Sequence, residues 1–116
     1  RDGTTSRGLG DVYKRQRVIS ELNNYQFKLV KINNDFIWHK HDDTDEAFIV
    51  IEGKMFIELR NETVEINEGE MIVIPKGTEH KPFSKKETKV MIIEPKGVTN
   101  TGNKKDKLTA PNNTWI

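Results

Sequence analysis

The sequence is most informative in two stretches, W-H-K-H-D-D-T-D-E-A-F-I-V-I-E-G at residues 38–53 and G-E-M-I-V-I-P-K-G-T-E-H at residues 69–80. Together they contain all three histidines of the chain, which are His39, His41 and His80. Residues two apart in a strand point to the same face, so His39 and His41 would project together from an extended segment. Imidazole nitrogens combined with a carboxylate suit a divalent transition metal such as Zn, Fe, Mn, Ni or Co. The sequence therefore predicts a metal site, in which Glu46, at the start of an apolar run, supplies the carboxylate.

Short runs rich in β-branched and aromatic residues, separated by Gly, Pro, Asn and Asp, recur along the chain and predict strands. The predicted strands are residues 25–33, 36–41, 46–52, 55–60, 63–66, 71–74, 80–83 and 89–94, and residues 18–24 are either a short helical turn or a strand. Many short strands without a long helical period predict an all-β sandwich or barrel. Its core is expected to include Phe48, Val50, Ile57, Leu59, Ile72 and Ile74.

The two stretches also resemble the two signature motifs of the cupin superfamily. The first, H-x-H-x4-E-x6-G, runs from His39 to Gly53, and the second, G-x5-P-x-G-x2-H, runs from Gly69 to His80. The gap of fifteen residues between the two glycines is the short gap of compact microbial cupins. The order of the motifs and the gap between them both fit this family.

This resemblance covers about residues 25–94 and implies a double-stranded β-helix, the jelly-roll barrel of the cupins. It implies one divalent transition metal ion held by four ligands, which are His39, His41, Glu46 and His80. It also implies a homodimer. The chain departs from the usual motifs at Asn33, where glycine is common and where asparagine can also take a left-handed conformation, and at Ser84, where asparagine is common. Neither position is a ligand, so the departures concern turns and not the metal site.

Four protein ligands around an octahedral ion leave two positions for water, substrate or oxygen. The resemblance therefore implies a metal-dependent enzyme that acts on a small molecule, either a dioxygenase with a redox-active metal or an isomerase with a redox-silent one. Two alternatives stay open: a non-catalytic module that binds or senses a small ligand through the metal, and a metal-free structural or storage barrel. The sequence identifies no further catalytic residue and no substrate.

The lining of the cavity depends on register, because a slip of one residue turns every side chain of a strand to the other face. The polar candidates are Tyr25, Lys28, Lys40 and Glu52, and the apolar candidates are Met55, Phe56, Met91 and Ile93. An apolar lining would suit a small, partly hydrophobic ligand. Trp38 points away from its histidine neighbour and is expected to pack or to lie in an interface.

Each site residue also has a structural interpretation. An isolated H-x-H pair is more often a pair of ordinary histidines, and the metal interpretation depends on the partners at the other two signature positions. Asp42, Asp43 and Asp45 form an acidic turn, and one of them could replace Glu46 as a ligand. Gly53, Gly69 and Gly77 are expected to serve turns that need a left-handed backbone.

Residues 1–16, R-D-G-T-T-S-R-G-L-G-D-V-Y-K-R-Q, show neither an apolar period nor a capping pattern. From residue 6 onward they resemble the translation of a sequencing adapter, so we interpret residues 1–16 as not native and residues 17–116 as a single cupin domain with a C-terminal extension from residue 95. A natural basic tail is the alternative. On this interpretation the native N-terminus is missing, and a leader peptide is not excluded.

Composition restricts the remaining possibilities. Without residues 1–16 the chain has fifteen basic and sixteen acidic side chains, a net charge of −1, so its basicity gives no reason to expect a nucleic-acid partner. It has no cysteine, which excludes disulfides and thiolate metal sites and fits a cytoplasmic location. No apolar run reaches the length of a membrane helix. The expected partners are a small molecule and a second copy of the chain.

Overall fold

Seven β-strands form the part of the chain that the computed structural model describes, residues 13–98 and residue 102. They are β1 (Tyr13–Leu22), β2 (Tyr25–Asp35), β3 (Glu46–Glu52), β4 (Lys54–Glu58), β5 (Thr63–Asn67), β6 (Met71–Ile74) and β7 (Lys81–Pro95). Every pairing between them is antiparallel. The described residues contain no helix, and hence none that could cross a membrane. The all-β prediction is confirmed, and the segment predicted as either a turn or a strand belongs to β1.

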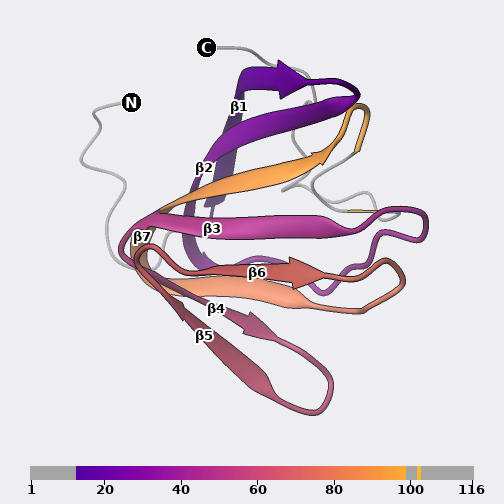
Figure 1. Cartoon of the computed structure of the whole chain (residues 1–116). Helices are drawn as coiled ribbons and strands as arrows, with labels where there is room; N and C mark the ends of the chain where they lie inside the picture. Colours follow the sequence, from indigo (N-terminus) through magenta and orange to yellow (C-terminus); the bar gives the residue numbers. More distant parts are fainter. Residues whose placement is uncertain (1–12, 99–101, 103–116) are drawn as a thin grey trace.

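The long strand β7 connects the two layers of the fold. Its later part lies between β2 and β3 in the sheet β1-β2-β7-β3-β6, whereas its first residues pair with β4, which in turn pairs with β5. In Figure 1 the salmon part of β7 lies beside β4 and its orange part lies beside β2. The prediction of two separate strands, at residues 80–83 and 89–94, is therefore wrong. Residues 85–87, which lie between the two predicted strands, are exposed and form a bulge opposite Asn33, which lets the strand bend without ending.

The inner face of this sheet changes character along its strands. The registers align its buried side chains in rows that run across β2, β7 and β3. These rows are Val30, Val90 and Val50; then Lys28, Ile92 and Phe48; then Gln26, Glu94 and Glu46, where the last step extends the β3–β7 register by one residue. The interior is therefore apolar at one end and polar at the other.

At the end where the interior is polar, the outer face of the same sheet is apolar. Two rows cross β2, β7, β3 and β6, namely Phe27, Ile93, Ala47 and Val73, and Leu29, Met91, Ile49 and Met71. Met71 and Val73 are 57% and 49% exposed. The prediction that Met91 and Ile93 line the cavity is wrong, because the register turns them to the outer face.

The core packs between the two layers. Of the six residues expected there, Phe48, Val50, Ile57 and Ile74 are buried, and Leu59 and Ile72 pack against them while partly exposed. Gly53 has a φ of +100°, and a Cβ at this position would lie 2.9 Å from Thr88 Oγ1. This turn therefore needs glycine both for its conformation and for space. The left-handed asparagine of the β2 end is Asn34, not Asn33.

Strand β1 pairs with β2 along its length and includes residues 13–16. Gln16, opposite Val30, is buried against the interior. The non-native origin of residues 1–16 stays a hypothesis. Residues 1–12 of this segment lie outside the described part of the chain. Most of the expected C-terminal extension also lies outside it.

Candidate metal centre

Two of the three histidines face each other through a single backbone bridge. His39 N donates to His80 O at 3.0 Å, and His80 N donates to His39 O at 2.9 Å. The two ring centroids are 4.3 Å apart. The strand predicted at residues 36–41 does not form, because only His39 takes part in this bridge. This bridge nevertheless fixes the two histidines side by side, and His80 directly precedes β7.

Backbone carbonyls orient both of these rings in the same way. His39 Nδ1 lies 2.8 Å from Ile37 O, and His80 Nδ1 lies 2.9 Å from Thr78 O. A protonated Nδ1 that donates to a carbonyl leaves Nε2 with the lone pair that a metal needs. This local contact therefore prepares each ring for ligation through Nε2.

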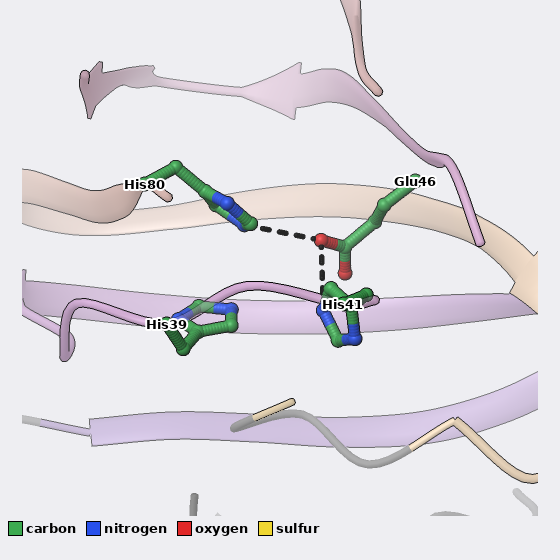
Figure 2. Close-up of side chains that lie close together, drawn as sticks. All are labelled: His39, His41, Glu46 and His80. Carbon is green, nitrogen blue, oxygen red and sulfur yellow. Dashed lines mark ion pairs between the residues drawn. The ribbon is translucent and has the colours of Figure 1, made fainter. Parts of the chain in front are cut away.

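Glu46 brings the remaining parts of the cluster together. It is the first residue of β3, and its Oε1 lies 3.3 Å from Nε2 of His41 and 3.3 Å from Nε2 of His80, as Figure 2 shows. One potential ligand atom from each of the four predicted residues lies within 4.8 Å of the others, and all four residues are buried. The structure thus brings together His39, His41, Glu46 and His80, and metal binding by them stays a prediction.

The acidic turn before β3 is held by other contacts. Asp45 Oδ1 accepts a hydrogen bond of 2.8 Å from Lys76 N, and His41 O accepts one of 2.8 Å from Gly77 N. These bonds join the turn to the residues that follow β6. Asp45 therefore faces the backbone at Lys76, and the carboxylate in the cluster is that of Glu46, as the motif predicts.

The cluster fits a divalent transition metal by its own chemistry. Nε2 of His41 and Nε2 of His80 are buried and have no hydrogen-bond partner among the described residues. Buried polar atoms of this kind are costly, and native proteins normally satisfy them. Three imidazole nitrogens and one carboxylate form a donor set that Zn, Fe, Mn, Ni and Co accept. A bound ion would satisfy these atoms at once.

A small cavity of about 200 Å³ reaches the cluster at His41. Its other lining residues are Asp42, Asp43, Thr44, Gly97, Val98 and Gly102. We therefore interpret this cavity, which lies between the acidic turn and Gly97, Val98 and Gly102, as the access to the site. A larger hollow of about 680 Å³ lies around Gly53 and residues 85–88, near the end of β3 away from Glu46, and is not connected with this chemistry.

Of the other predicted lining residues, Lys28 lies in the interior. Its Nζ donates to Glu94 Oε2 at 2.6 Å and to Val98 O at 3.2 Å. Sequence reasoning missed Glu94, and the only signal for it was its strand position, which could not be used without the register. The remaining polar candidates are wrong, because they are exposed: Tyr25, Lys40 and Glu52.

The remaining apolar candidates lie elsewhere. Met55 is in the core, and Phe56 stacks on Phe83 with ring centroids 5.0 Å apart. Trp38, as expected, packs: Arg60 lies 3.8 Å above its ring, and Arg60 Nε donates to Glu79 Oε1 at 3.0 Å.

Lys81 follows His80 but belongs to the surface. Burial lowers the pKa of Lys81, but the hydrogen bond and the charge of Glu58, together with Asp35, outweigh burial and raise the pKa above its ordinary value. Its Nζ lies 3.2 Å from Glu58 Oε1 and 3.5 Å from Asp35 Oδ2. Surface carboxylates thus pair with the lysine that follows His80.

The comparison with known families agrees with this geometry. A family model described as a cupin domain matches residues 28–104. The chain belongs to the cupin family, and the seven-stranded fold is a jelly-roll cupin barrel.

Individual relatives support the same assignment. A cupin-2 domain containing protein from Shewanella frigidimarina is 55% identical, with a TM-score of 0.71 over 73% of this chain and 83% of that chain. Protein NMB1881 from Neisseria meningitidis is 31% identical, with a TM-score of 0.65 over 73% of this chain and 87% of that chain. The uncharacterized protein YdbB from Bacillus subtilis is 37% identical over 79 residues, which cover 67% of this chain and 70% of that protein. None of these three names specifies a reaction, and only the first specifies a domain. The chemistry is therefore inferred from the residues of the site.

Proposed function

We propose that this cupin is a metal-dependent enzyme of the dioxygenase or isomerase type that acts on a small molecule. His39, His41, Glu46 and His80 would hold one divalent transition metal ion. The observation that carries the proposal is the convergence of buried donor atoms, with Nε2 of both His41 and His80 at 3.3 Å from the same Glu46 oxygen. An arrangement this costly to bury is best explained by an ion that binds all four residues.

The bound ion would supply Lewis-acid or redox chemistry, with two coordination positions left for water, substrate or oxygen. The protein residues supply orientation and a dry environment. The carbonyls of Ile37 and Thr78 fix the rings of His39 and His80. Phe48, whose ring centroid is 6.2 Å from that of His80, covers the cluster from the core side and restricts water there.

The size of the cavity supports a small ligand. Its volume of about 200 Å³ lies below the range of about 300–1,000 Å³ that is typical of sites for drug-sized molecules. The small molecule would enter past Asp42 and Asp43. His41 is the predicted metal-binding residue that it would contact first.

A homodimer is the second part of the proposal. The two apolar rows on the outer face of the sheet would be buried if this face packed against the same face of a second copy. Ile49→Lys places a charge in the centre of this face and should yield a monomer in sedimentation velocity. Thr63→Lys, on the exposed start of β5, should leave the dimer intact. A wild-type protein that sediments as a monomer would contradict this part.

Metal analysis of the full chain, purified without a nickel column, tests the function. We expect about one transition metal ion per chain in the wild-type protein and in the neighbouring control Glu79→Gln, and a clearly lower metal content in His80→Ala, because one of four ligands is removed and the remaining three hold the ion more weakly. Turnover of a small-molecule library that stops on chelation supports the enzyme. Metal-dependent binding without any product would favour the binding or sensing module instead. A wild-type chain without metal, whose melting temperature does not respond to added Zn²⁺, Fe²⁺ or Mn²⁺, would contradict the proposal.

A further inference from the structure

The interior of the barrel holds a buried ion pair besides the histidine cluster. Lys28 is 0% exposed and Glu94 is 2% exposed, and Lys28 Nζ lies 2.6 Å from Glu94 Oε2. Among residues 15–98 and 102, Lys28 is the one buried lysine or arginine. A buried ion pair rarely stabilises a fold more than apolar side chains of similar size would. The pair therefore needs an explanation other than stability.

The register places this pair next to the cluster. Ala47 pairs with Ile93, so the preceding residue of β3, Glu46, lies across from Glu94 of β7. Both side chains are buried on the inner face. Side chains at opposite positions of an antiparallel pair have Cβ atoms about 4.5–5.5 Å apart. The carboxylate of Glu94 is thus the closest carboxylate by strand position to the predicted ligand Glu46.

A second carboxylate at this distance is a potential fifth ligand. If Glu94 turned toward the ion, it would occupy one of the two positions that a substrate or oxygen needs. The charge-assisted hydrogen bond holds the carboxylate of Glu94 against Lys28 of β2, which borders β7 on the side opposite β3 and Glu46. Lys28 also donates to Val98 O at 3.2 Å, and Val98 lines the access cavity together with His41.

We propose that Lys28 is a positioning residue that holds Glu94 outside the coordination sphere, so that the metal centre keeps four protein ligands and two open positions. This inference rests on the proposed metal centre. It assigns a role to a side chain that contacts neither the ion nor the substrate and that acts through Glu94.

Co²⁺ binding with azide as a second ligand tests this role in the full-length protein. Lys28→Met should release Glu94 to the ion, tighten Co²⁺ binding by about 10- to 100-fold, the range in which outer-shell changes act, and weaken the azide-induced change in the visible spectrum by a similar factor. Lys28→Met/Glu94→Gln should return both values to those of the wild-type protein, because an uncharged amide is a poor ligand. Lys31→Met, on the outer face of β2, is the matched control and should change neither value.

The outcomes separate this inference from the proposed function. A wild-type protein that does not bind Co²⁺ contradicts the metal centre itself. A folded Lys28→Met protein with wild-type Co²⁺ and azide binding overturns only the role of Lys28. If Lys28→Met does not fold, Glu94→Gln gives the answer: unchanged Co²⁺ affinity and azide response support the inference, whereas a loss of Co²⁺ affinity overturns it, because Glu94 would then already be a ligand.

Discussion

The row Val30, Val90 and Val50 and the row Gln26, Glu94 and Glu46 lie on the same face of the same three strands, yet only the first looks like the interior of a protein. The valine row follows the expectation that burial of apolar surface drives folding. The polar row lies two steps along the strands and is equally buried. Burial alone therefore cannot explain why two of its three side chains are carboxylic acids.

The difference separates an apolar end, which packs as a core, from a polar end, which contains the candidate metal centre. Glu46 completes the histidine cluster, and Glu94 is held by Lys28. Buried titratable groups gathered in one place are typical of functional sites, and the larger hollow near Gly53 has no comparable group of buried charges. Four variants test this contrast, in order of decreasing effect on stability.

Placing a charge in the valine row should have the largest effect. Val50→Asp buries a carboxylate without a partner, and we expect a loss of more than about 4 kcal/mol in the free energy of unfolding, measured by urea denaturation. Ile51→Asp is the control, because Ile51, the residue after Val50, is 45% exposed. Equal losses for both variants would show that the inner face at this end is not a packed core.

Removing the charges from the polar end should have the opposite sign. Lys28→Met/Glu94→Leu replaces the buried ion pair by apolar side chains, and we expect the metal-free protein to gain roughly 1–4 kcal/mol. The same denaturation experiment, performed in the presence of a chelator, measures the gain. A clear loss of stability would mean that the ion pair stabilises the fold. This result would contradict the contrast between the two rows.

A smaller gain is expected from the cluster itself. Glu46→Gln keeps the shape of the side chain and removes one of two neighbouring negative charges. Like charges at opposite strand positions are destabilising, so the metal-free protein should gain up to about 1 kcal/mol while its metal affinity falls. Calorimetric titration with Zn²⁺ and thermal melting with chelator give the two values. A loss in metal-free stability would indicate that Glu46 is structural.

The smallest effect is expected outside both rows. Arg60→Ala removes an exposed ion pair with Glu79 and the contact with Trp38, and such surface pairs contribute about 0–1 kcal/mol. Metal content should not change. An effect on metal binding would indicate that the segment around Trp38 belongs to the metal site.

The fold class and the four cluster residues could be predicted because each depends on local sequence. Strand spacing and turn residues predict the all-β fold, and the two motifs specify the order and the spacing of His39, His41, Glu46 and His80. Lys28 and Glu94 could not be paired in this way, because 66 residues separate them and their faces depend on a register that a single bulge can shift. The continuity of β7 was missed for a related reason. The charged residues 85–87 interrupt the apolar pattern, and only pairing with β2 on both sides shows that the strand passes through them.

X-ray absorption spectroscopy of the metal-loaded protein tests the central claim most directly. The claim predicts three imidazole nitrogens and one carboxylate oxygen at about 2.0–2.2 Å from a single ion, with one imidazole lost in His80→Ala. An ion surrounded only by water and exposed carboxylates, or a spectrum that His80→Ala leaves unchanged, would contradict it.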